Sequence, residues 1–310
     1  MHPTASKLLC TLIRYEQPLA LLGFYYLSNK LLHLAFSALS GLHYYVLAQW
    51  FPTRDYRQYG RWAVVMVEPG TLSIYYAEEL ARKHMDIQII CGIEDKERLT
   101  KFSKYLHNKY NVNVGEVLSY NLDKEATDAI LESLKDKLSK LDTIGVMVNQ
   151  MVARCSPERF GDGDSSVCEM SEHIRVMLLM THLTQFVLRK MAGQSSGVIV
   201  NISDPSGEYP HSNESIHSAS CAYMDYFSRS LSREVFYDNI HVQSLTPYLG
   251  EIDDGDGREN QCTWLSISPP TVARNAVNGI GKTRSYGHWV YGLRGFLASL
   301  VPLCLRERLY

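Results

Sequence analysis

The sequence has little of what marks a nucleic-acid-binding, metal-binding or disulfide-stabilised protein. Its 310 residues carry a formal net charge of −2 and show no cluster of basic residues, so no nucleic-acid partner is predicted. Its seven cysteines are odd in number, widely scattered and without a Cys-x-x-Cys pair, a pattern that predicts neither a disulfide framework nor a metal site. Internal repeats and low-complexity segments are also missing. We therefore expect a globular protein whose folded part faces a reducing compartment.

Charged residues are missing from one long stretch near the N-terminus. Residues 31–51 contain no Lys, Arg, Asp or Glu, and aromatic residues gather at the end of this run. About 20 apolar residues can span a bilayer, and Trp and Tyr favour its interfaces. We therefore predict that residues 1–55 are a hydrophobic, membrane-associating extension. A buried or interfacial amphipathic helix is the alternative. The arginines that follow, Arg54, Arg57 and Arg61, favour a cytoplasmic flank.

From residue 61 onward, short apolar runs alternate with helical patterns. Strands are expected over residues 62–67, 87–91, 114–119, 144–148, 197–202 and 240–245, and helices over 72–83, 95–109, 126–141, about 167–191 and from 216. This alternation is typical of a parallel sheet covered by helices on both faces. The predicted fold class is α/β: a doubly wound, Rossmann-like parallel sheet with a hydrophobic N-terminal helical extension. The length fits one such domain, at residues 56–292, followed by an apolar tail over residues 293–310.

The clearest motif lies in residues 201–225, where a predicted strand is followed by a polar loop with Pro and Gly and then by a helix. This layout resembles the catalytic segment of the short-chain dehydrogenases/reductases. In that family the strand ends in a serine, and the helix presents Tyr-x-x-x-Lys. Here the serine position holds Asp204, the tyrosine position His217 and the lysine position Cys221. The resemblance therefore implies the frame of the family's site without its reacting groups.

Each of these replacements removes a chemical function. A phenol, whose ordinary pKa is about 10, exchanges protons poorly at neutral pH unless a cation lowers that pKa. A lysine one helical turn away supplies this charge, and Cys221 does not. Ionised Asp204 only accepts hydrogen bonds and would repel a developing oxyanion. His217 titrates in a suitable range, so either a substitute acid working with Asp204 or a structural histidine fits the residue.

A hydrolase that uses Asp204, His217 and Ser218 or Ser220 is a further alternative. Two features argue against it: Ser218 lies on a different helix face from His217, and the sequence contains no nucleophile elbow.

The turn after the first predicted strand should hold the cofactor if one binds. The family has Thr-Gly-x-x-x-Gly-x-Gly there, because glycines let the backbone approach the pyrophosphate. The three glycine positions hold Val67, Thr71 and Ser73, Glu68 adds a negative charge, and Gly70 falls in a different position.

Other positions of the family's cofactor site and proton relay agree. The residue expected to hold a 2′-phosphate is Gly92, the relay asparagine is Val176, and the threonine of the carboxamide site is Ile252. The Asn-Asn-x-Gly motif reads Asn149-Gln-Met-Val, so that Asn149 is the main survivor. We predict that no cofactor binds. NADP or NAD belongs to the alternative in which this site still works.

The likeness is strongest to the branch that contains very-long-chain 3-oxoacyl-CoA reductase and the 17β-hydroxysteroid dehydrogenases, including an inactive dehydrogenase-like member. Residues 58–65, 76–81, 242–245 and 262–264 carry it. The resemblance implies the endoplasmic reticulum membrane, or a mitochondrion as for the inactive member. It also implies steroid or fatty-acyl chemistry, and pairing through the helices at residues 167–191 and 216–235. The pair would be a homodimer or a heterodimer with an active relative.

Two functions remain as alternatives. We predict a catalytically inactive, dehydrogenase-like pseudoenzyme at a membrane, which binds a partner or an apolar steroid or lipid ligand. The alternative is an NAD(P)-dependent oxidoreductase of steroid or fatty-acyl metabolism with an unusual active site. A bound dinucleotide would favour the second, because Val67, Glu68 and Cys221 separate the two readings.

Overall fold

The computed structural model describes residues 16–42, 45, 55–122, 125–150, 160, 167–248 and 267–300. The chain divides into two compact units, Met1–Leu47 and Ala48–Tyr310. In the first unit, helix α2 (Glu16–Leu42) exposes large apolar side chains along its length. Among the described residues, no helix combines the length and the apolar character needed to cross a bilayer. Of the predicted uncharged run 31–51, residues 43–44 and 46–51 lie outside the described part of the chain.

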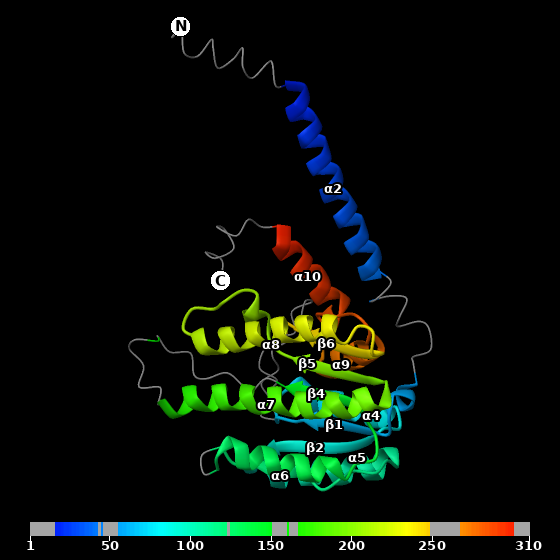
Figure 1. Ribbon diagram of the computed structural model, residues 1–310, viewed down its shortest axis with the longest axis vertical. Coiled ribbons are helices and arrows are strands. Elements are labelled where there is room, and N and C mark those ends of the chain that lie inside the picture. The colour runs from blue at the N-terminus through cyan, green and yellow to red at the C-terminus, as the bar shows by residue number, and fades with distance from the viewer. Residues whose placement is uncertain are drawn as a thin grey trace. The chain divides into compact units, whose positions relative to one another are not determined.

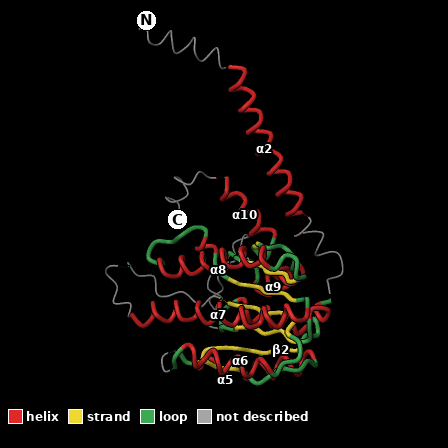
Figure 2. The backbone as a smooth tube through the Cα atoms, in the orientation of Figure 1, coloured by secondary structure: helices red, strands yellow, loops and turns green. Residues whose placement is uncertain are grey.

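The second unit is built on a seven-stranded parallel sheet (Figures 1 and 2). Its strands are β1 (Trp62–Met66), β2 (Asp86–Gly92), β3 (Leu118–Tyr120), β4 (Ile144–Gln150), β5 (Gly197–Ile202), β6 (Ile240–Leu245) and β7 (Arg284–Ser285). Their order in the sheet is β3-β2-β1-β4-β5-β6-β7, and all described pairs are parallel. From β1 the chain first adds strands on one side of the sheet, β2 and β3, and then on the other side, beginning with β4. This change of side confirms the predicted doubly wound fold.

Helices cover both faces of this sheet. Alternate strand residues point to opposite faces, so that Ala63 and Val65 belong to one apolar core and Val64 and Met66 to the other. The first core is closed by α4 (Leu72–Arg82), α5 (Lys96–Tyr110), α9 (Pro269–Asn278) and α10 (Trp289–Leu300). The second is closed by α6 (Thr127–Ser139), α7 (Val167–Gln194) and α8 (Ser215–Glu234). Short 3-10 turns, η2 (Tyr56–Tyr59), η3 (Ile93–Asp95) and η4 (Pro205–Gly207), complete the unit.

Two parts of the fold differ from the sequence prediction. The third strand begins at Leu118 rather than at residue 114, and Val114 forms only an isolated bridge with Ile87. The side-chain amide of Gln88 donates to the carbonyl of Glu116 at 2.7 Å, so a side chain takes the place of the strand ladder there. Helix α9, strand β7 and helix α10 were not predicted, and α10 runs across the expected boundary at residue 292.

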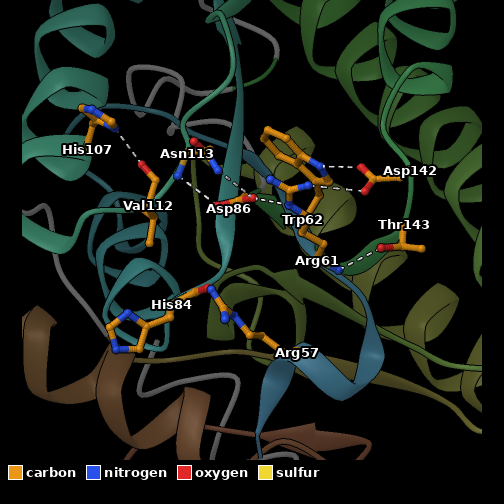
Figure 3. Close-up of polar contacts among 10 residues, drawn as sticks. All are labelled: Arg57, Arg61, Trp62, His84, Asp86, His107, Val112, Asn113, Asp142 and Thr143. Atoms are coloured by element: carbon orange, nitrogen blue, oxygen red, sulfur yellow. Dashed lines mark hydrogen bonds and ion pairs between the residues drawn. The ribbon is translucent and has the colours of Figure 1, made fainter.

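Two facing glycines let the chain cross the amino end of the sheet. A Cβ on Gly145 of β4 would lie 2.7 Å from the backbone N and O of Gly60, which follows η2. An ion pair and a hydrogen bond join residues of the same region (Figure 3). Arg61 pairs with Asp86 at 2.6 Å, and the indole N–H of Trp62 donates to Asp142 at 3.0 Å. The amino ends of β1, β2 and β4 are therefore locked to one another.

A chain of buried amides links the middle of the sheet to two helices. Asn149 of β4 and Asn201 of β5 are paired in register, and the Nδ2 of Asn149 donates to Asn201 Oδ1 at 2.7 Å. The same Nδ2 donates to Thr184 Oγ1 of α7 at 2.9 Å, and Asn201 Nδ2 donates to Ser228 Oγ of α8 at 2.7 Å. These four side chains are buried, and we call them the amide ladder.

Replacing Gly145 with Ala should destabilise the protein by about 2 kcal/mol or more, because the contact it would create is with backbone that has no room to move. Gly193→Ala on α7 is the matched control. No atom lies within 4 Å of a Cβ there, and Ala in a helix stabilises by roughly 0.5–1 kcal/mol relative to Gly. Urea unfolding measures both free energies. Equal effects of the two substitutions would contradict the close approach at Gly145.

Asn149→Ala should destabilise by roughly 2–4 kcal/mol, because it removes two donated hydrogen bonds and leaves buried acceptors on Asn201 and Thr184. Asn108→Ala, at an exposed position of α5, is the control and should be neutral or slightly stabilising. Thermal unfolding of the two variants provides the measurement. An Asn149→Ala variant as stable as the wild type would show that the amide ladder contributes nothing.

Candidate functional site

The turn between β1 and α4 satisfies its own polar groups. Thr71 Oγ1 donates to the carbonyl of Glu68 at 2.7 Å, and the backbone N–H of Glu68 donates to Ser73 Oγ at 3.1 Å. The two hydroxyls also lie 2.7 Å apart, Ser73 is fully buried and Val67 packs in the core. Gly70 takes the left-handed conformation, with φ 80°, that the turn requires. Val67, Thr71 and Ser73, which stand where the family has glycine, therefore lie close together in the chain. The side chain of Val67 fills the core, and those of Thr71 and Ser73 fill the turn.

A cavity of about 180 Å³ opens next to this turn, at the carboxyl ends of β1, β2, β3 and β4. Its lining includes four carboxylates: Glu68, Glu94, Asp95 and Glu172. Lys, Arg and His are missing from the described residues that line it, and Gly92 provides no side chain at the predicted 2′-phosphate position. The site is therefore electronegative where a dinucleotide would place its phosphates.

Two titratable groups respond to this environment. Burial raises the pKa of the Tyr120 phenol, and the charges of Glu68, Glu172 and Asp95 raise it further. Burial also raises the pKa of the Cys91 thiol to about 11, with a smaller contribution from Asp95. At neutral pH both groups are uncharged, so neither adds a charge to the cavity. Among the described residues, no group of His, Cys, Asp and Glu side chains could hold a metal ion.

The predicted hydride-site positions lie at the end of β5 and along α8. Asp204 Oδ1 accepts from the backbone N–H of Ser206 at 2.8 Å, so this carboxylate caps η4. His217 and Cys221 lie one helical turn apart and are both buried, with 3.5 Å between His217 Nε2 and Cys221 Sγ. Cys221 cannot give His217 the positive charge that a lysine would supply. Val176, the relay position, is a buried apolar residue that also lines the cavity.

Sequence reasoning missed two residues at this site. Ser203 precedes Asp204, and its buried hydroxyl has no hydrogen-bond partner among the described residues. The rings of His173 of α7 and His217 form a T-shaped pair, with 6.5 Å between the ring centroids. The adjacent Ser203-Asp204 pair was the available signal for the first. Nothing in the spacing of His173 marks it, because the fold alone brings α7 to α8.

An ion-pair network fixes the loop that follows β5. Arg284 of β7 pairs with Glu208 at 2.6 Å and with Asp225 of α8 at 3.4 Å, and Ser244 donates to the same Asp225 at 2.7 Å. The loop beside the hydride-site positions is therefore held to the far edge of the sheet. Three positions considered from sequence, Met151, Val152 and Ile252, lie outside the described residues.

Comparison with solved structures finds the same fold. A structure of a 7β-hydroxysteroid dehydrogenase superposes with a TM-score of 0.69 at 15% identity and covers 82% of this chain and 98% of its own. A short-chain dehydrogenase from Sphingobium yanoikuyae in complex with NADPH matches with a TM-score of 0.53 at 24% identity, over 60% of this chain and 70% of that one. At these identities the likeness concerns the fold alone.

Comparison of sequences is more specific. The chain is 31% identical, over 93% of its length and 87% of the relative's, to inactive hydroxysteroid dehydrogenase-like protein 1 of Pongo abelii. It is 33% identical to the very-long-chain 3-oxoacyl-CoA reductase of Mus musculus, over 78% of this chain and 76% of that protein. Both relatives belong to the branch that the sequence motifs predicted, and that prediction is confirmed. The family model for short chain dehydrogenases matches residues 61–255, which is more than half of the chain, and the protein belongs to that family.

Proposed function

We propose that this protein is a catalytically inactive member of its family, which acts at a membrane by binding a partner or an apolar steroid or lipid ligand. The observation that supports this most directly is the turn after β1. There Thr71 and Ser73 hydrogen-bond to each other, and Ser73 accepts from the backbone N–H of Glu68, a donor that would otherwise be available to a phosphate. The name of the relatives matched over 93% of this chain, inactive hydroxysteroid dehydrogenase-like protein 1, agrees with the proposal.

Two independent obstacles oppose hydride transfer. Each hydrogen bond lost to a charged phosphate weakens binding by ~1.5–3 kcal/mol, so the loss of a few lowers affinity by several orders of magnitude. The carboxylates around the cavity, Glu68, Glu94, Asp95 and Glu172, add repulsion. At the hydride site, proton transfer contributes about 10²–10⁴ in rate, and the acid, its cation and the carbonyl-orienting hydroxyl are all replaced.

The N-terminal extension attaches the protein to a membrane, that of the endoplasmic reticulum or of a mitochondrion. Support comes from α2, which exposes Leu21, Phe24, Leu31, Phe36 and Leu39, each by more than half of its surface. Exposed apolar surface of this extent is unfavourable in water and is usually covered by lipid or protein.

The protein also pairs through α7 and α8, with another copy or with an active relative. Several apolar residues of these two helices pack in the protein's own core, including Met180, Leu183, Val187 and Leu231. Other apolar residues of the two helices point outward and remain available to a partner. Ile174 and Leu178 on α7, and Tyr223 and Tyr226 on α8, are 41–67% exposed. The hydroxyls of Thr181 and Tyr223 lie 2.8 Å apart and join the two helices into one surface.

The wild-type chain should show no binding of NADPH or NADH at concentrations up to about 1 mM, and no turnover of 3-oxoacyl-CoA or 17-ketosteroids. Isothermal titration calorimetry measures binding. The double variant His217→Tyr with Cys221→Lys should restore neither activity nor binding, because the turn at Thr71 and Ser73 remains filled. Micromolar binding, with wild-type turnover that disappears in His217→Phe, would establish the alternative oxidoreductase.

Leu178→Glu combined with Tyr226→Glu should convert pairs into single chains, because a buried carboxylate without a partner opposes association. Light scattering of the full chain in detergent, corrected for bound detergent, gives the mass. Phe236→Glu with Tyr237→Glu is the matched control, since these residues are 72% and 93% exposed beyond the end of α8. A wild-type chain of monomeric mass that co-purifies with no relative would contradict the pairing.

A further inference from the structure

Helix α10 is apolar on two opposite faces. On its inner face Val290 and Tyr291 are buried in the core, and Tyr291 accepts a hydrogen bond from the backbone of Ile267 at 3.1 Å. On its outer face Trp289, Leu293 and Leu297 follow one another at intervals of one helical turn, and their exposed fractions are 52%, 48% and 53%. A helix that is apolar all round is normally covered on every side, so the outer stripe requires a cover.

The charge carried by α10 itself is of one sign. The sequence of α10 contains no Asp, Glu or Lys, and its single charged residue is Arg294. The Arg294 guanidinium lies 4.5 Å from the ring centroid of Tyr248, beside the stripe rather than across it. In the printed sequence, the ten residues that follow α10 are largely apolar and carry Arg306 and Arg308 against one acid, Glu307. Trp, Leu and flanking Arg are the composition of helices that lie in a membrane interface.

We propose that the outer face of α10 lies in the interfacial region of a lipid bilayer, with Trp289, Leu293 and Leu297 below the level of the head groups and Arg294 at that level. The twelve described residues of α10 extend over ~18 Å, and Val290 and Tyr291 on the inner face pack in the core, so only the outer face is free to meet lipid and α10 lies along the bilayer. The α7–α8 surface offers a contrast, because there apolar residues are mixed with the paired hydroxyls of Thr181 and Tyr223, as in a protein interface.

This contact deepens the proposed membrane association and adds a second attachment point on the folded domain itself. The two attachments are separable. The extension could hold the chain at a membrane with α10 in water, and α10 could bind lipid when the extension does not.

The test uses the full chain reconstituted into vesicles of phosphatidylcholine and phosphatidylserine whose acyl chains are brominated near the head group. Bromine quenches tryptophan fluorescence at short range. The experiment is made in a Trp50→Phe background, which removes the tryptophan of the N-terminal extension. There Trp289→Phe should lose the largest share of the quenching, whereas Trp62→Phe should retain it, because the Trp62 indole is held by Asp142 at the amino end of the sheet. Quenching that is unchanged when Trp289→Phe is added to this background would overturn the proposal.

A flotation experiment separates the two attachments. Leu31→Gln with Leu32→Gln weakens the extension, and in that background Leu293→Gln with Leu297→Gln should lower the vesicle-bound fraction at least about tenfold. Phe236→Gln with Tyr237→Gln removes exposed apolar surface elsewhere and should leave binding unchanged. Binding that is lost with the α2 substitutions alone, together with unquenched Trp289, would refute the α10 contact and leave the membrane extension standing. Binding unaffected by the α2 substitutions would refute the extension and leave α10.

Discussion

The amide ladder is the interaction on which the rest of the domain depends. Asn149 and Asn201 face each other across β4 and β5, and their side chains reach Thr184 on α7 and Ser228 on α8. Four elements thus meet through buried polar groups, and an unpaired buried group is costly. These hydrogen bonds join β4, β5, α7 and α8 to one another. The same arrangement brings His217, Cys221 and Asp204 to the site where the family carries out its chemistry.

The scaffold and the chemistry are therefore under different constraints. The ladder joins two strands to two helices, whereas the turn after β1 need only connect a strand to a helix. An enzyme of this fold keeps backbone N–H groups of that turn available for a phosphate, and unsatisfied donors reduce stability. In this protein Ser73 accepts from the Glu68 N–H and Thr71 donates to the Glu68 carbonyl. The turn is thus stabilised by internal hydrogen bonds that use groups a phosphate would otherwise bind.

Much of the fold could be predicted from the sequence, because strands buried on both faces appear as apolar runs and the connecting helices as amphipathic patterns. The sequence from β5 into α8 also identified Asp204, His217 and Cys221 as the positions that correspond to the family's serine, tyrosine and lysine. The prediction failed for elements that are very short or contain Pro or Gly, and for contacts between residues far apart in the sequence. Strand β7 has two residues, α9 begins at a Pro-Pro pair that is read as a break, and α10 contains two glycines. The Arg284–Glu208 pair joins residues 76 positions apart, a separation that no local pattern encodes.

The side chains that fill the turn after β1 limit which substitutions the protein can accept there. Restoring glycine at Val67, Thr71 and Ser73 would remove a buried side chain and two hydroxyls that satisfy one another, so each reversal costs stability before any phosphate binds. The carboxylates of the neighbouring cavity would still repel the phosphate. Activity would also require a cation in place of Cys221, in a site that is fully buried. Several destabilising steps thus separate this sequence from an active enzyme.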